Sequence, residues 1–109
     1  MTKEAAQQTI EKMVHRIVER FGPEKIILFG SHACGTAGPD SDADLLVVMP
    51  VEGSKRERAV EIDLALAGMG LPKDVIVVTP EEVERYRDTV GSIIYPAVHE
   101  GAVLYERVA

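Results

Sequence analysis

The chain has 109 residues, of which 46% are hydrophobic and 28% are charged, a composition typical of one soluble globular domain. Acidic residues outnumber basic ones by 18 to 12, which argues against a long nucleic acid as partner because no basic excess exists to displace counterions. The single cysteine, Cys34, excludes an internal disulfide. The first residues lack the apolar run of a signal peptide, and no stretch reaches the length of a membrane span. We therefore expect residues 1–109 to form one cytoplasmic domain without a membrane partner.

Apolar periodicity and turn residues divide the chain into alternating helices and strands. Residues 3–20 place apolar side chains on one face of a helix, whereas "KIILF", "ADLLVVM" and "KDVIVV" are short runs rich in β-forming residues. We expect helices over 3–20, 32–37, 52–67, 80–87 and, with a break, 93–101, and strands over 25–29, 43–49, 73–78 and, at a sheet edge, 102–108. This alternation predicts an α/β fold, α+β by some schemes, in which helices pack on a small sheet.

Good capping residues stand at several predicted helix starts. The candidates are Thr2, Ser31, Ser54 and Thr79. Gly22-Pro23 ends the first helix, and the sequence "GPDS" at 38–41 has turn chemistry.

Three carboxylates stand at the start of predicted strands. Asp42 and Asp44 are two positions apart, so on a strand they project to the same face, about 6.6 Å apart. Asp74 holds a comparable position before four β-branched residues. If the second and third strands are neighbours, the three carboxylates meet at one edge of the sheet, where mutual repulsion raises their pKa values. Magnesium would remove this conflict, and two ions about 3.5–4 Å apart can clamp the oxygens of a phosphoryl displacement.

Gly30 and Ser31 lie where the first strand turns into a short helix. Such a turn presents free backbone N–H groups to a phosphate, and glycine lets the backbone approach closely. The Ser31 hydroxyl can donate to a phosphate oxygen. The sequence therefore predicts a site in which Gly-Ser holds the phosphates of a nucleotide and the aspartates hold its metal ions.

The stretch "FGSHACGTAGPDSDADLLVV" closely resembles the minimal nucleotidyltransferase domain of the DNA polymerase β superfamily. The signature of that family is Gly-Ser, ten residues, Asp-x-Asp and a third carboxylate on a later strand. Gly30, Ser31, Asp42 and Asp44 match this spacing, and Asp74 matches the third acid. The resemblance implies the nucleotidyltransferase fold, with a short mixed sheet flanked by helices.

The resemblance also implies a reaction and a partner. Such enzymes use two Mg²⁺ ions to move a nucleotidyl group, usually from ATP, to a hydroxyl with loss of pyrophosphate. Asp42 and Asp44 would bind both metals, and Asp74 would bind one and help deprotonate the acceptor. Short bacterial and archaeal relatives are typically encoded beside a helical HEPN-type ribonuclease toxin. They act as its antitoxin, in some pairs by adenylylating a toxin tyrosine.

Two departures from the family pattern leave other interpretations open. Relatives often read Gly-Ser-x-Ala-Arg-Gly, but here Cys34 replaces the arginine, and it is expected to be a small packed residue rather than a nucleophile. His32 stands where a basic residue is frequent, and either a phosphate contact or a helix surface fits it. One alternative is an inactive antitoxin that neutralises its partner by binding. Another is a small-molecule nucleotidyltransferase of the aminoglycoside type, whose acceptor pocket a homodimer or partner would complete.

Overall fold

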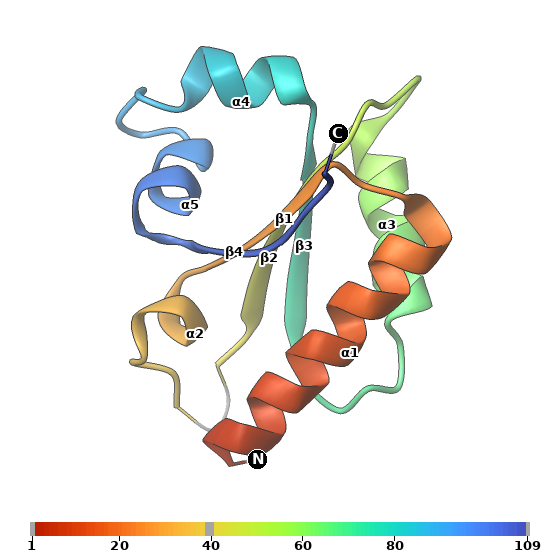
Figure 1. Ribbon diagram of the computed structural model, residues 1–109, viewed down its shortest axis with the longest axis vertical. Coiled ribbons are helices and arrows are strands. Elements are labelled where there is room, and N and C mark those ends of the chain that lie inside the picture. Colours follow the sequence, from red (N-terminus) through yellow and green to blue (C-terminus); the bar gives the residue numbers. More distant parts are fainter. Residues whose placement is uncertain (1, 39–40, 109) are drawn as a thin grey trace.

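The computed structural model describes residues 2–38 and 41–108. The helices are α1 (Lys3–Phe21), α2 (Ser31–Cys34), α3 (Lys55–Ala65), α4 (Pro80–Tyr86) and α5 (Ile94–Glu100), and the strands are β1 (Lys25–Phe29), β2 (Ala43–Val48), β3 (Lys73–Val78) and β4 (Ala102–Glu106) (Figure 1). The predicted order of helices and strands is confirmed. The predicted turn at 38–41 includes residues 39 and 40, which lie outside the described residues.

The four strands form one mixed sheet in the order β3-β2-β1-β4. β1 pairs antiparallel with both β2 and β4, whereas β2 and β3 run parallel, joined by a crossover that contains α3. The prediction of a short mixed sheet with flanking helices is therefore confirmed. The predictions that β4 is an edge strand and that β2 and β3 are neighbours are also confirmed.

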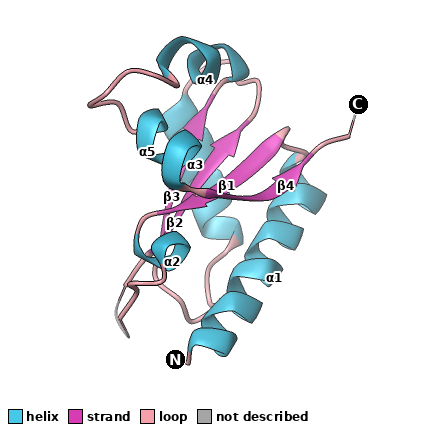
Figure 2. Ribbon diagram, turned by 60° about the vertical axis from the view of Figure 1, so that its left-hand side comes forward, coloured by secondary structure: helices cyan, strands magenta, loops and turns pink. Residues whose placement is uncertain are grey.

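The helices divide between the two faces of the sheet, with α1 and α3 on one side and α4 and α5 on the other (Figure 1). The short helix α2 follows the end of β1, and its Ala33 packs against the apolar cluster that α1 and α3 cover. α1 and α3 cover the first face, where Met13, Ile17 and Ile62 pack against Leu45 and other strand residues. α1 also contacts the edge strand β4 (Figure 2). α4 and α5 pack on the second face, around Leu46, Val48, Val78, Ile94 and Ala97. β1, β2 and β3 thus contribute alternate side chains to two apolar layers, whereas β4 adds only Tyr105 to the first.

Side-chain caps set where three of the helices begin. The hydroxyls of Thr2, Ser54 and Thr79 accept hydrogen bonds from backbone N–H groups three residues later, at 3.1, 3.1 and 3.2 Å. Because Ser54 caps α3, that helix begins at Lys55, not at residue 52 as predicted, and it ends at Ala65. At α4, the Glu82 carboxylate also accepts from the Thr79 N–H at 2.9 Å, which completes a capping box.

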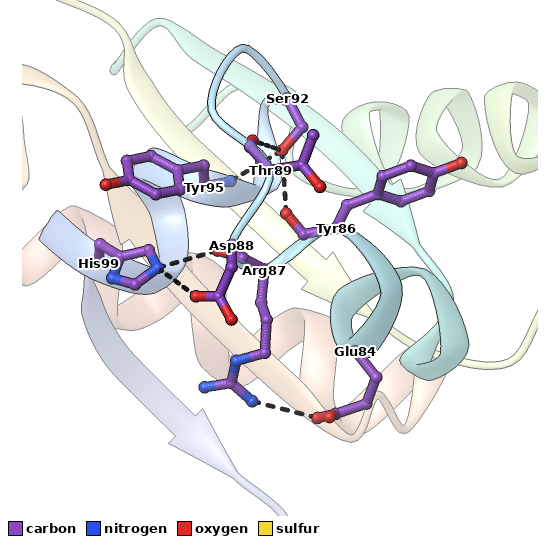
Figure 3. A network of polar contacts seen from close by, with 8 residues as sticks. All are labelled: Glu84, Tyr86, Arg87, Asp88, Thr89, Ser92, Tyr95 and His99. Atoms are coloured by element: carbon purple, nitrogen blue, oxygen red, sulfur yellow. Dashed lines mark hydrogen bonds and ion pairs between the residues drawn. The ribbon is translucent and has the colours of Figure 1, made fainter.

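The connection from α4 to α5 is held by Ser92 (Figure 3). The Ser92 Oγ donates toward the carbonyl oxygens of Tyr86 and Thr89, at 3.2 and 2.9 Å, and accepts from the Tyr95 N–H at 3.2 Å. One hydroxyl therefore joins the end of α4, the turn and the first residues of α5.

His99 makes a second link between the same segments. Its Nε2 lies 2.9 Å from the Arg87 carbonyl oxygen and 3.1 Å from an Asp88 carboxylate oxygen, and its ring lies 4.3 Å from that of Tyr95 (Figure 3). These contacts fasten α4 to α5, the two helices that cover part of the second face. None of the helices among the described residues has the length and apolar character needed to cross a bilayer.

Candidate functional site

Asp44 and Asp74 are neighbours on the parallel strands β2 and β3, where the register pairs them directly. Leu46 and Val48, which share the strand face of Asp44, belong to the apolar layer under α4 and α5. Both carboxylates therefore lie on the second face, at the end where the two strands begin. The predicted meeting of these two acids at one edge of the sheet is confirmed.

Asp42 lies near Asp44, but not as a residue of the same strand, which was the basis of the prediction. β2 begins at Ala43, so Asp42 lies in the loop before the strand, and strand alternation does not by itself fix its direction. The Ala43 N–H donates to the Pro72 carbonyl oxygen at 2.8 Å, which ties the end of this loop to the segment before β3. Asp42 still lies near enough to Asp44 for its charge to act on that carboxyl.

The surroundings of Asp44 raise the pKa of its carboxyl above the usual range. Burial is the largest cause, and the negative charges of Asp74 and Asp42 follow, while His32 acts in the opposite direction. The expected repulsion among the three acids is thus present at Asp44, although burial contributes more to it. A cation beside Asp44 would relieve both effects because it favours the charged form.

The backbone of Gly30 lies directly against the Asp44 side chain. Gly30 has φ 77° and ψ −153°, a conformation that is essentially limited to glycine. A Cβ atom at this position would collide with Oδ2 of Asp44. Phe29, the preceding residue, is the register partner of Asp44 in the antiparallel pair of β1 and β2. Glycine is therefore needed here for its conformation and for the close approach of a carboxylate.

The turn after Gly30 is tighter than predicted. Gly30, not Ser31, is the N-cap, and Ser31 is the first residue of a four-residue helix in place of the expected helix over 32–37. The Gly30 carbonyl oxygen accepts from the N–H groups of Ala33 and Cys34 at 3.2 and 3.1 Å. The N–H groups of Ser31 and His32 come too early in the helix to have a helical acceptor, so they suit a phosphate oxygen.

The sequence left the contact of His32 undecided and predicted the burial of Cys34 wrongly. The His32 Nε2–H donates to the Ser41 carbonyl oxygen at 3.0 Å, a contact that no local pattern predicts. Cys34 is exposed, so the expectation of a packed cysteine is wrong. Because α2 ends at Cys34, its side chain has no further helical turn to pack against.

The donor set fits magnesium chemically, since Asp42, Asp44 and Asp74 offer only oxygen ligands. Within residues 2–38 and 41–108, no three His, Cys, Asp or Glu side chains are grouped so that they could hold a metal ion, so the predicted cluster of all three carboxylates does not form a protein cage. Magnesium rarely needs such a cage, because it keeps water and takes phosphate oxygens from a nucleotide. The raised pKa of Asp44 and the close approach of the Gly30 backbone make this end of the sheet the candidate site for such an ion.

A comparison with protein families agrees with this geometry. Residues 10–96 match the model of the nucleotidyltransferase domain, and the chain belongs to that family. The match contains Gly30, Ser31 and the three aspartates. The roles of these five residues stay predictions, because a family match does not test single side chains. Among curated proteins, none matches the sequence.

Two solved structures share the fold. A Sulfolobus solfataricus protein predicted to be a nucleotidyltransferase aligns with a TM-score of 0.64 at 22% identity, over 98% of this chain and 91% of that one. A chain from a crystal structure of a toxin–antitoxin with AMP-PNP aligns with a TM-score of 0.54 at 23% identity, over 89% of this chain and 73% of that one. At these identities the likeness establishes the nucleotidyltransferase fold.

Proposed function

We propose that the protein transfers AMP from magnesium-bound ATP to a protein hydroxyl, a tyrosine of a HEPN-type ribonuclease toxin, and so acts as its antitoxin. One observation carries the catalytic part of the proposal. Asp44 and Asp74 stand in register on one sheet face, and the Gly30 backbone lies against Asp44 at the same place. This arrangement supports the proposal, because the turn after Gly30 lies beside two carboxylates, as the binding of one nucleotide with its metal ions requires.

Each residue has a distinct task in this proposal. The N–H groups after Gly30 and the Ser31 hydroxyl bind phosphate oxygens of ATP. Asp42, Asp44 and Asp74 hold two Mg²⁺ ions, which when bound supply positive charge to the phosphates and the attacking oxygen. Asp74 is exposed, so it is accessible to an incoming hydroxyl and accepts its proton. The new bond joins that oxygen to the α-phosphorus, and pyrophosphate leaves.

The partner is proposed on a separate basis. The neighbouring structure described as a toxin–antitoxin with AMP-PNP supports a pair of proteins and an adenine nucleotide. The resemblance to short nucleotidyltransferases supplies the HEPN class of the toxin and tyrosine as the acceptor. The proposed partner and acceptor can therefore be wrong even if the proposed nucleotide binding is right.

Intact-mass spectrometry of the neighbouring gene's product tests the proposal. That product is incubated with Mg²⁺ and ATP together with either the wild-type chain or the Asp42→Asn/Asp44→Asn variant. We expect an AMP adduct only with the wild type. Asp88→Asn is a matched control, because Asp88 is also an exposed loop acid but contacts His99, away from the site; this variant should transfer AMP normally.

A second function, neutralisation by binding alone, is favoured by the exposed, uncharged Cys34 where relatives often carry arginine. The same experiment separates the two functions. A stable complex with both versions and no adduct would support binding alone and contradict AMP transfer. Nucleotide binding is read separately, since Mg²⁺ and AMP-PNP should raise the melting temperature of the wild type but not of the double variant.

A further inference from the structure

Asp42 lies between two backbone groups that are each tied to another segment. The Ser41 carbonyl, which belongs to the peptide group joining Ser41 to Asp42, accepts from His32 Nε2–H at 3.0 Å. On the other side, the Ala43 N–H donates to the Pro72 carbonyl oxygen at 2.8 Å. Asp42 is exposed, and Ala43 beside it is fully buried. The position of this carboxylate therefore depends on the contacts of its two neighbours.

Gly38 and Ser41, which precede Asp42, are joined by two hydrogen bonds. The Gly38 N–H donates to Ser41 Oγ at 2.8 Å, and the Ser41 N–H donates to the Gly38 carbonyl oxygen at 3.2 Å. His32 connects this turn to α2, the element that begins directly after Gly30. Its half-buried ring thus bridges the turn after Gly30, proposed to bind phosphate, and the loop that carries Asp42.

We propose that His32 is a positioning residue, which holds Asp42 in place relative to Gly30 and Asp44 through its hydrogen bond to the Ser41 carbonyl. A carbonyl can only accept, so the contact requires a proton on Nε2 and works with a neutral ring. The expected effect of His32 on nucleotide affinity rests on the proposed function, whereas its expected effect on the position of the loop does not. The alternative role of His32 is a direct contact of its imidazole with phosphate. The two roles predict different effects when the side chain is replaced.

Two substitutions separate these roles. His32→Gln keeps an N–H donor at nearly the distance of Nε2, whereas His32→Leu has similar bulk and no donor. His15→Leu is the control, because His15 is an exposed histidine of α1 that pairs with Glu19, one turn away. All three variants should keep the fold, which circular dichroism checks.

The first measurement is amide hydrogen exchange in the protein without nucleotide. We expect exchange at the Gly38 and Ser41 N–H groups to quicken by about threefold to tenfold in His32→Leu, the change that loss of one hydrogen bond allows. His32→Gln and His15→Leu should exchange like the wild type. Unchanged protection of this turn in His32→Leu would overturn the inference, whatever the fate of the proposed function.

The second measurement is the affinity for AMP-PNP with Mg²⁺, followed by calorimetry. Affinity should fall by about threefold to tenfold in His32→Leu and return in His32→Gln. Equal losses in both variants, with the turn still protected in His32→Gln, would show a direct phosphate contact and overturn the positioning role. Absence of binding by the wild type would refute the proposed function, and the exchange measurement would still decide whether His32 fixes the turn.

Discussion

Both faces of the sheet are apolar along most of β2 and β3, but at the start of these strands the second face carries carboxylates. On the first face, Ala43, Leu45 and Val47 are fully buried under α1 and α3. On the second face, the matching series along β2 begins with Asp44 and continues with Leu46 and Val48, both buried. Helices α4 and α5 pack over the apolar part of that face. The comparison shows that a small sheet can carry carboxylates on one face where the covering helices stop, while the opposite face of β2 stays apolar and buried along the strand.

The largest effect on stability should come from the first face. Leu45→Ala removes a fully buried side chain and leaves a cavity, so the free energy of unfolding should fall by about 2–5 kcal/mol. Denaturant unfolding measures this loss. Leu104→Ala on the exposed edge strand is the control and should cost much less. A similar loss in both variants would contradict the assignment of Leu45 to a tightly packed layer and of Leu104 to an exposed strand.

Gly30→Ala should have the next largest effect, and it should act on both stability and the site. The required backbone conformation alone makes a side chain unfavourable by about 1–3 kcal/mol. The added Cβ also displaces the Asp44 carboxylate, so binding of magnesium and AMP-PNP should be lost.

Gly53→Ala separates these two consequences. Gly53 has φ 90°, and a Cβ there would meet no atom within 4 Å. This variant should lose stability through its backbone and retain nucleotide binding in calorimetry. If Gly30→Ala bound nucleotide as well as Gly53→Ala does, close approach to Asp44 would not matter for the site.

Thr79→Ala weakens the helix cover of the second face without touching an acid of the site. Loss of the N-cap of α4 should lower the free energy of unfolding by about 1 kcal/mol. Nucleotide affinity should be unchanged, since α4 lies toward the opposite end of the strands. Thr79→Ser should restore stability, and a large loss of affinity in Thr79→Ala would show that the two ends of this face are coupled.

The smallest effect on stability should come from Asp44→Asn, and its sign should be opposite to that of the other changes. Folding raises the pKa of Asp44, so the folded state holds this proton more tightly than the unfolded chain does. Ionisation of Asp44 therefore opposes folding increasingly as the pH rises above about 3.9, the value in an unfolded chain. At neutral pH the asparagine variant should melt slightly higher than the wild type, and below about pH 3.9 the difference should vanish.

Glu82→Gln provides the opposite case in the same thermal melts. Its pKa is lowered by hydrogen bonds from Lys55 and Thr79, so its charge stabilises the folded state above about pH 4.3. The glutamine variant should therefore be less stable at neutral pH and approach the wild type as the pH falls through the lowered pKa. The same sign of change for both variants would mean that Asp44 is not held at a cost to folding.

Local patterns in the sequence were enough to place the strands and the two strand-borne acids. The apolar, β-forming runs in "ADLLVV" and "KDVIVV" assigned Asp44 and Asp74 to comparable positions near the strand starts, and the register pairs them directly. Patterns failed where a contact between distant segments decides the structure. Asp42 lies just outside β2, beside Ala43, whose N–H donates to the Pro72 carbonyl oxygen, and His32 donates to the Ser41 carbonyl oxygen. No spacing rule indicated that Gly30 would lie against Asp44, although its place between strand and helix marked it as special.

The mixed pairing of the strands has a consequence for the order of folding. β1 and β2 are close in sequence and form an antiparallel pair, whereas the parallel pair of β2 and β3 must close a crossover that places Asp44 and Asp74 thirty positions apart. Contacts between distant residues form slowly because the loop entropy is lost before the pairing compensates for it. A chain with only the first pair would contain Gly30, Asp42 and Asp44 but not Asp74 beside them. Competence to bind the metal and nucleotide should therefore appear only after the β1–β2 pair has formed, and its rate would report the docking of β3.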